Sequence, residues 1–197
     1  MSILKQWKGV NGYMIRDPGT FFSEYDETHG AGYPLAFMLL SFLATMLPFA
    51  ALVMLFNLAS PADAAIGIVV ALIFGIVAWI FGVIEALVAH VIASLFGGRG
   101  ASLTLEAYAF PTLIRSGLWW LPVIGWATGF YGWYLQIKGL AAFHDISTGK
   151  AVVAAVIAVI LYIPAVIIIA AVIAAFVLDL GNPPETQPAM LLLDVLA

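Results

Sequence analysis

Long runs of apolar residues dominate this chain and leave it few ways to fold. Hydrophobic residues make up 64% of the sequence and charged residues only 9%. A water-soluble protein with this composition could not cover its apolar surface with polar groups, so the solvent around it has to be lipid. The sequence therefore predicts a polytopic membrane protein.

Five of these runs are candidates for membrane crossing, because a helix of about 20 residues spans a hydrocarbon core of roughly 30 Å. Interfacial tryptophans near Leu118–Pro122 divide the third run from the fourth. The sequence thus predicts an all-α fold, a bundle of five transmembrane helices preceded by an interfacial helical segment. The expected organisation is a leader at 1–32, spans at about 33–58, 65–96, 104–120, 122–143 and 151–178, and an external tail at 179–197.

Basic residues are distributed unevenly among the connections between these runs. With one exception, Arg115, they fall on the same side of the predicted membrane: Lys5, Lys8, Arg16, Arg99, Lys138 and Lys150. The positive-inside rule places this side in the cytoplasm, with the N-terminus inside and the C-terminus outside. We expect a multi-pass integral membrane protein, in the cell membrane if the chain is prokaryotic.

The leader contains an amphipathic pattern. Ile3, Trp7, Val10 and Met14 recur at helical spacing, which favours a helix lying at the membrane interface. A flexible leader with a few apolar residues is the alternative. Asp17 followed by proline is typical of the start of a second short helix, which we expect to end near residue 25.

An ionisable side chain within a span costs about 2.5 to 3.5 kcal/mol at the helix centre and so needs a structural or functional reason. We predict a buried polar cluster of Glu85, Arg115, Tyr108 and His90, in which Glu85 pairs with Arg115 and Tyr108 adds a hydrogen bond. The competing interpretation has Arg115 extending to the outer interface while Glu85 stays protonated. Glu106 points to the opposite helix face and is expected to reach the headgroups.

A second set of residues falls near the cytoplasmic ends of the spans. We predict contacts with headgroups or a partner there from Gly97, Gly98, Arg99, Lys138, His144 and Lys150. A metal site is not predicted, because Glu85 and His90 are five residues apart and diverge by about 140° around a helix.

Sequence motifs for catalysis are missing. The chain contains no HExxH, GxSxG or phosphate-loop pattern, no cysteine and no basic patch of the kind that binds nucleic acid. We therefore expect neither an enzyme nor a bound cofactor.

Several motifs in order resemble the Yip family, the Ypt/Rab-interacting membrane proteins. They are Asp17-Pro18-Gly-Thr-Phe-Phe22, His90-Val-Ile-Ala-Ser-Leu-Phe-Gly-Gly-Arg-Gly100, Leu105-Glu-Ala-Tyr-Ala-Phe-Pro111, and Trp133-Tyr-Leu-Gln-Ile-Lys-Gly-Leu140 with His144 and Gly149-Lys-Ala151. The resemblance implies a five-span helical protein with a cytoplasmic N-terminus. Eukaryotic relatives are associated with Rab-type GTPases and traffic between endoplasmic reticulum and Golgi, whereas this compact chain looks more like prokaryotic members.

The expected function is that of a non-enzymatic scaffold or adaptor in membrane organisation or trafficking. Its partners would be membrane lipids and a protein at the cytoplasmic face. The alternative is a small-solute or ion transporter that uses the buried polar cluster. Gly125 and Gly129 form a GxxxG pattern that supports close packing within the bundle or in a homo-oligomer.

Overall fold

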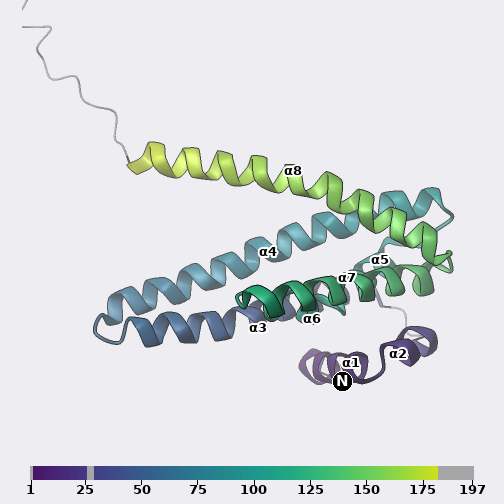
Figure 1. The fold of residues 1–197 in the computed structure, drawn as a ribbon, viewed down its shortest axis with the longest axis horizontal. Coiled ribbons are helices and arrows are strands. Elements are labelled where there is room, and N and C mark those ends of the chain that lie inside the picture. Colours follow the sequence, from purple (N-terminus) through teal and green to yellow (C-terminus); the bar gives the residue numbers. More distant parts are fainter. Residues whose placement is uncertain (1, 26–28, 182–197) are drawn as a thin grey trace, which may run out of the picture. The chain divides into compact units, whose positions relative to one another are not determined.

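The computed structural model describes residues 2–25 and 29–181, and these residues form α-helices and short connections without any strand. The all-α prediction is confirmed. Figure 1 shows the helices in chain order. They are α1 (Ile3–Arg16), α2 (Pro18–Glu24), α3 (Gly32–Phe56), α4 (Pro61–Leu95), α5 (Ala101–Ala109), α6 (Thr112–Ser116), α7 (Pro122–His144) and α8 (Thr148–Gly181).

Three of these helices are long and apolar enough to cross a membrane: α3, α4 and the Thr148–Ile169 part of α8. The chain is thus a helical membrane protein, although the sequence predicts five such helices. α7 has 23 residues, which is enough to span, but Gln136 and Lys138 within it lower its hydropathy.

The predicted span at 104–120 is not one unbroken helix in the structure. This segment consists of two short helices, α5 and α6, separated at Phe110 and Pro111. Proline has no backbone N–H to donate and its ring clashes with the preceding turn, which favours the break at Pro111, although α3 and α8 continue through Pro48 and Pro164.

The chain divides into two compact units, residues 1–162 and residues 163–197. The first unit contains α1 to α7 and the beginning of α8. The second contains the rest of α8, which includes Pro164. Most of the predicted external tail, residues 182–197, lies outside the described residues.

The leader is helical, as predicted, but its apolar face packs on protein. Met14 is fully buried, and the Trp7 indole N–H donates to Ser41 Oγ on α3 over 2.9 Å. The alternative of a flexible leader does not describe α1. Lys5, Lys8 and Arg16 remain exposed within about 80° of one another around the helix.

Asp17 begins α2 as the sequence predicts. Its carboxylate accepts hydrogen bonds from the Thr20 hydroxyl at 2.7 Å and the Thr20 backbone N–H at 3.1 Å. These bonds stabilise the ionised form and lower the pKa of Asp17.

Aromatic side chains join α2 to the membrane helices. Phe21 and Tyr25 contact Phe110, with ring centroids 5.7 and 5.2 Å apart, and Phe22 contacts Phe143 at 5.7 Å. Tyr25 also lies 5.2 Å from Phe143. Because aromatic pairs of this kind, two of them edge-to-face and two tilted, add to the stabilisation from burial, α2 is an integral part of the core.

Candidate functional site

Glu85 on α4 and Arg115 on α6 form the buried ion pair that the sequence predicts. Arg115 Nη1 lies 3.0 Å from both carboxylate oxygens of Glu85. The Glu85 side chain is 3% exposed and that of Arg115 is 29% exposed. The competing interpretation, in which Arg115 leaves the acid for the outer interface, is therefore wrong for this structure.

A third member of this cluster, Gln136 on α7, was missed by sequence reasoning. Its Oε1 accepts from the same Arg115 nitrogen at 2.9 Å, and the side chain is buried. An uncharged amide in a span costs less free energy than a charged side chain, so its presence there did not call for a partner. A buried glutamine nevertheless needs a hydrogen-bond partner, and that requirement could have identified it.

Glycines on α7 allow this helix to approach the Arg115 segment. A Cβ atom at Gly132 would overlap the Cβ and Cα atoms of Arg115, and one at Gly125 would lie 2.6 Å from the Leu118 carbonyl oxygen. At Gly129 the nearest atom would be the Arg115 carbonyl oxygen at 3.8 Å, an ordinary contact. The close packing predicted from GxxxG therefore occurs within one chain, and Gly132 adds the tightest approach.

Two predicted members of the cluster do not bond to it. Tyr108 is buried close to the pair, but its hydroxyl has no hydrogen-bond partner among the described residues. The predicted hydrogen bond from Tyr108 is thus wrong. His90 bonds instead to Thr104, toward the far end of α4, because five residues rotate its side chain away from the direction of Glu85.

His90, Thr104 and His144 form a second polar cluster. Thr104 Oγ1 lies 3.0 Å from His90 Nδ1 and 2.8 Å from His144 Nε2, while the Arg99 backbone N–H donates to His144 Nδ1 at 2.8 Å. His144, predicted to contact headgroups, is 1% exposed and serves instead as an internal link between Arg99 and α5.

The direction of these hydrogen bonds follows from the Arg99 backbone N–H, because this group can donate but not accept. Because Nδ1 of His144 accepts from a backbone N–H, its proton sits on Nε2 and is donated to Thr104. The Thr104 hydroxyl then donates to His90. His144 lies just beyond the predicted span 122–143, and burial, together with the neighbouring His90 and Arg99, lowers its pKa from 6.5 to about 4.

The predicted contact residues 97–99 form the turn after α4, next to His144. Gly97 has φ 88°, a conformation that glycine adopts without strain, and a Cβ at Gly98 would lie 2.7 Å from the Ala93 carbonyl oxygen. Arg99 forms an exposed ion pair with Asp145 at 3.1 Å.

Lys150 and Lys138 complete the predicted contact residues. Lys150 Nζ lies 3.5 Å from the Phe96 carbonyl oxygen, beside the turn that ends α4. Lys138 stands apart on α7, exposed, with its ammonium 5.7 Å from the Tyr134 ring centroid. Of the six predicted residues, five therefore gather at one end of α4, α7 and α8.

Glu106 also differs from the prediction, since it does not reach the surface. Its side chain is fully buried, and Oε1 accepts from the His29 backbone N–H at 3.1 Å. His29 Nδ1 lies at the same distance. Glu106 therefore ties the segment before α3 to α5, and no pattern in the sequence connects two residues so far apart.

The two polar clusters offer hydrogen bonds and one cation, Arg115, that is held in place by its partners. Within residues 2–25 and 29–181, no three side chains of the metal-binding types converge. What the polar groups do is connect helices: α4, α6 and α7 through Arg115, and α4, α5 and α7 through Thr104.

Comparison with known proteins gives a family. No curated protein and no solved structure shows significant similarity to the chain. The model of the Yip1 domain matches residues 12–173, which reach from α1 into α8 and contain both polar clusters. The helical membrane fold, the ordered motifs and this match together show that the chain belongs to the Yip1 domain family.

Proposed function

We propose that this protein is a non-enzymatic membrane scaffold whose N-terminal helices present a basic surface to a partner. The observation that carries the proposal is the attachment of α1. Its apolar face is held by the burial of Met14 and by the Trp7–Ser41 hydrogen bond to α3, while Lys5, Lys8 and Arg16 are exposed. A basic face fixed to a membrane domain suits the binding of an acidic protein surface at a defined height above the bilayer.

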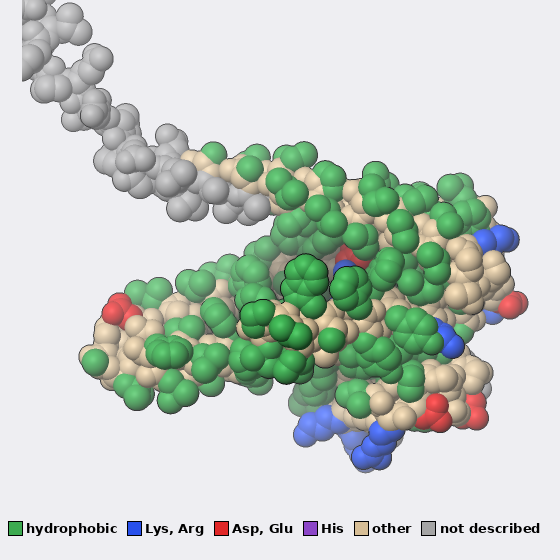
Figure 2. All heavy atoms as spheres, in the orientation of Figure 1, with side chains coloured by type: hydrophobic (Ala, Val, Ile, Leu, Met, Phe, Trp, Pro, Cys, Tyr) green, Lys and Arg blue, Asp and Glu red, His purple; other side chains and the backbone are tan. Residues whose placement is uncertain are grey.

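Figure 2 supports this division of the surface. Blue basic side chains gather along the lower edge of the view, on the N-terminal helices, whereas green apolar side chains cover much of the membrane helices. The surface built by Lys5, Lys8 and Arg16 is called the basic face below.

The topology that belongs to this proposal has five crossings, with α5 and α6 together forming the third and α7 the fourth. The N-terminus and the basic face are then cytoplasmic and the C-terminus is outside. Cysteine labelling tests it directly, because the chain has no cysteine of its own. We expect an impermeant maleimide applied outside intact cells to label Asp63→Cys and not Lys8→Cys. The reverse pattern would contradict the topology.

The scaffold itself is tested by photo-crosslinking from the basic face. Ile15 is 57% exposed on the same side of α1, so a photoreactive residue there is expected to form a discrete protein adduct in native membranes. Leu55, 62% exposed on α3, is the matched position for lipid contact only.

Charge variants complete this experiment. Lys5→Gln, Lys8→Gln and Arg16→Gln together should abolish the adduct, and Lys5→Arg, Lys8→Arg and Arg16→Lys should preserve it. An adduct that survives neutralisation of the basic face would contradict the proposal, as would the absence of any adduct at Ile15.

One observation favours transport as a second candidate. A cavity of about 200 Å³ between the helices is lined by Glu85, Arg115 and Gln136, among other residues. Solute flux into liposomes that disappears in the Glu85→Gln, Arg115→Gln double variant would support transport. Lack of flux across ions and small polar solutes would leave the scaffold as the function.

A further inference from the structure

The cation of the Glu85–Arg115 pair uses only part of its hydrogen-bonding capacity. All three acceptor oxygens around it, two from Glu85 and one from Gln136, bond to Nη1. Nη2 and Nε make no hydrogen bond within the described residues, and guanidinium carries three N–H groups on these two nitrogens. The edge of Arg115 formed by Nη2 and Nε is called the free edge below.

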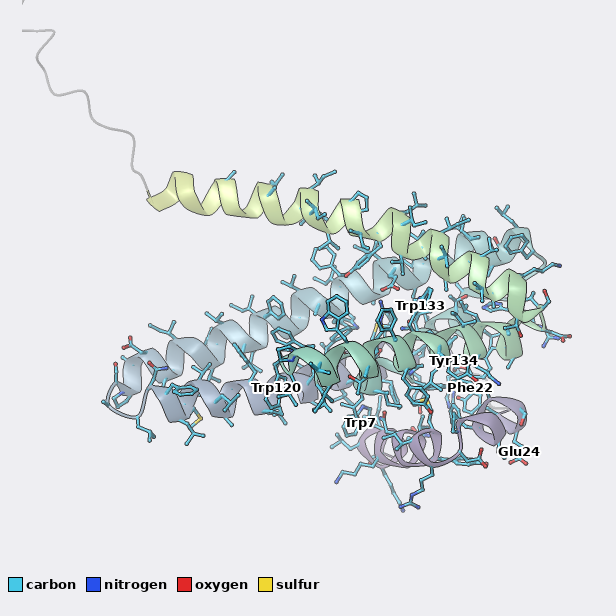
Figure 3. The ribbon with its side chains drawn as sticks, viewed as in Figure 1. Trp7, Phe22, Glu24, Trp120, Trp133 and Tyr134 are labelled. Carbon is cyan, nitrogen blue, oxygen red and sulfur yellow. The ribbon has the colours of Figure 1, made fainter. Side chains whose placement is uncertain are left out.

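Arg115 lies at a groove. Arg115 is 29% exposed and lines a cavity of about 400 Å³, separate from the polar cavity, together with Trp126, Gly129, Phe130, Trp133 and Val159. Figure 2 shows acidic and basic atoms at the bottom of a hollow in an otherwise apolar surface. Figure 3 shows Trp133 on the upper side of α7 in this view.

The residues that line this groove favour an amphiphilic ligand. Apart from Arg115 they are aromatic, aliphatic or glycine, and Trp126 and Phe130 are 72% and 66% exposed on the outer surface of α7. Tryptophan prefers the boundary between headgroups and acyl chains. A ligand that fills the groove therefore needs an apolar body along α7 and a strong acceptor that reaches the free edge.

Donors of a cation that stay without an acceptor inside a membrane bundle are costly, so an acceptor that reaches them would stabilise the cation. Phosphodiester oxygens match guanidinium geometry and accept two parallel hydrogen bonds. We infer that this groove is a phospholipid-binding site in which the lipid phosphodiester accepts from the free edge of Arg115 while an acyl chain lies against Trp126 and Phe130. Glu85 and Gln136 are positioning residues, because they hold Nη1 and so orient the free edge.

Two variants with different defects test the site. Glu85→Gln with Arg115→Gln removes the cation without leaving an unpaired buried carboxylate. Gly129→Leu keeps the pair and fills the groove, and the 3.8 Å separation expected for its Cβ leaves the backbone undisturbed. Val123→Leu, at a position 83% exposed and outside the groove, is the matched control.

The measurement is native mass spectrometry of purified protein in detergent, titrated with phosphatidylglycerol. We expect the dissociation constant of one bound lipid to rise about tenfold or more in both groove variants and to change less than about twofold in Val123→Leu. Melting temperatures within a few degrees of the parent would show that the variants are folded. Unchanged lipid binding in either groove variant would overturn the inference.

Two further probes test whether binding needs both the phosphate and the acyl chains of the lipid. Diacylglycerol, which lacks the phosphate, should bind at least about tenfold more weakly than phosphatidylglycerol. Inorganic phosphate should not compete at millimolar concentration, because it lacks the acyl chain that the groove binds. Equal binding of diacylglycerol, or effective competition by inorganic phosphate, would each overturn the assignment to a phospholipid.

Discussion

Two stretches of this chain differ in a way that reverses the usual rule for soluble proteins. Every residue from Thr104 to Thr112 is buried, although this stretch contains a glutamate, two threonines and a tyrosine. No residue from Leu47 to Val70 is buried, although that stretch is far more apolar. The less hydrophobic segment is at the centre and the more hydrophobic one is outside.

Lipid explains the difference. Acyl chains solvate Leu, Ile and Val as well as a protein interior does, so the end of the α3–α4 hairpin gains little by packing against the rest of the protein. Polar groups have no partner in hydrocarbon and are stable only where other polar groups meet them. The buried centre is thus defined by hydrogen bonds such as those of Arg115, Thr104 and Glu106.

Breaking the ion pair should have the largest effect on this centre. Glu85→Gln or Arg115→Gln alone leaves the other charge without its partner, and we expect a loss of about 3 kcal/mol in unfolding free energy. The double variant should recover much of this loss. Denaturant unfolding in mixed micelles measures all three, and single variants as stable as the parent would show that the pair does not hold the bundle together.

A pair of identical substitutions sharpens the comparison between the buried centre and the exposed end of the α3–α4 hairpin. Leu135 is fully buried and Leu55 is 62% exposed. Leu135→Ala creates a cavity and should cost about 2 to 4 kcal/mol, whereas Leu55→Ala, in contact with lipid before and after unfolding within the membrane, should stay within about 0.5 kcal/mol. Equal losses in the same micelle assay would contradict the lipid exposure of the hairpin.

The smallest expected effect is a pH dependence from His144. Its folded pKa of about 4 lies below the value of 6.5 for an unperturbed histidine, so the unfolded chain binds more protons in between. The stabilisation is complete above about pH 6.5 and declines as the pH falls toward 4.

His144→Asn is the matched variant, because an amide oxygen can replace Nδ1 as the acceptor from Arg99 without titrating. The melting temperature of the parent should fall between pH 6.5 and 4 by more than that of the variant. Parallel pH profiles would show that His144 titrates normally and that the hydrogen bonds around it do not hold it neutral.

Much of the fold was accessible from local patterns. The interruption at Pro111, however, divides one predicted span, and its effect depends on how α5 and α6 are accommodated by α7. In the candidate site, two opposite charges within predicted spans led to the hypothesis that Glu85 pairs with Arg115, beside the alternative of Arg115 at the outer interface. Gln136 and Thr104 were not found, because neutral polar residues are common in membrane helices and only their neighbours decide whether they matter.

The sequence by itself determined that lipid surrounds this protein, that its backbone is helical and that α4 buries its glutamate, since hydropathy, length and helical periodicity act over neighbouring residues. Only the tertiary structure decided that α1 packs on α3, that His144 is internal and that Arg115 keeps a free edge. These features depend on which side chains meet across helices, and hydrogen-bond partners far apart in the chain leave no periodic trace in it.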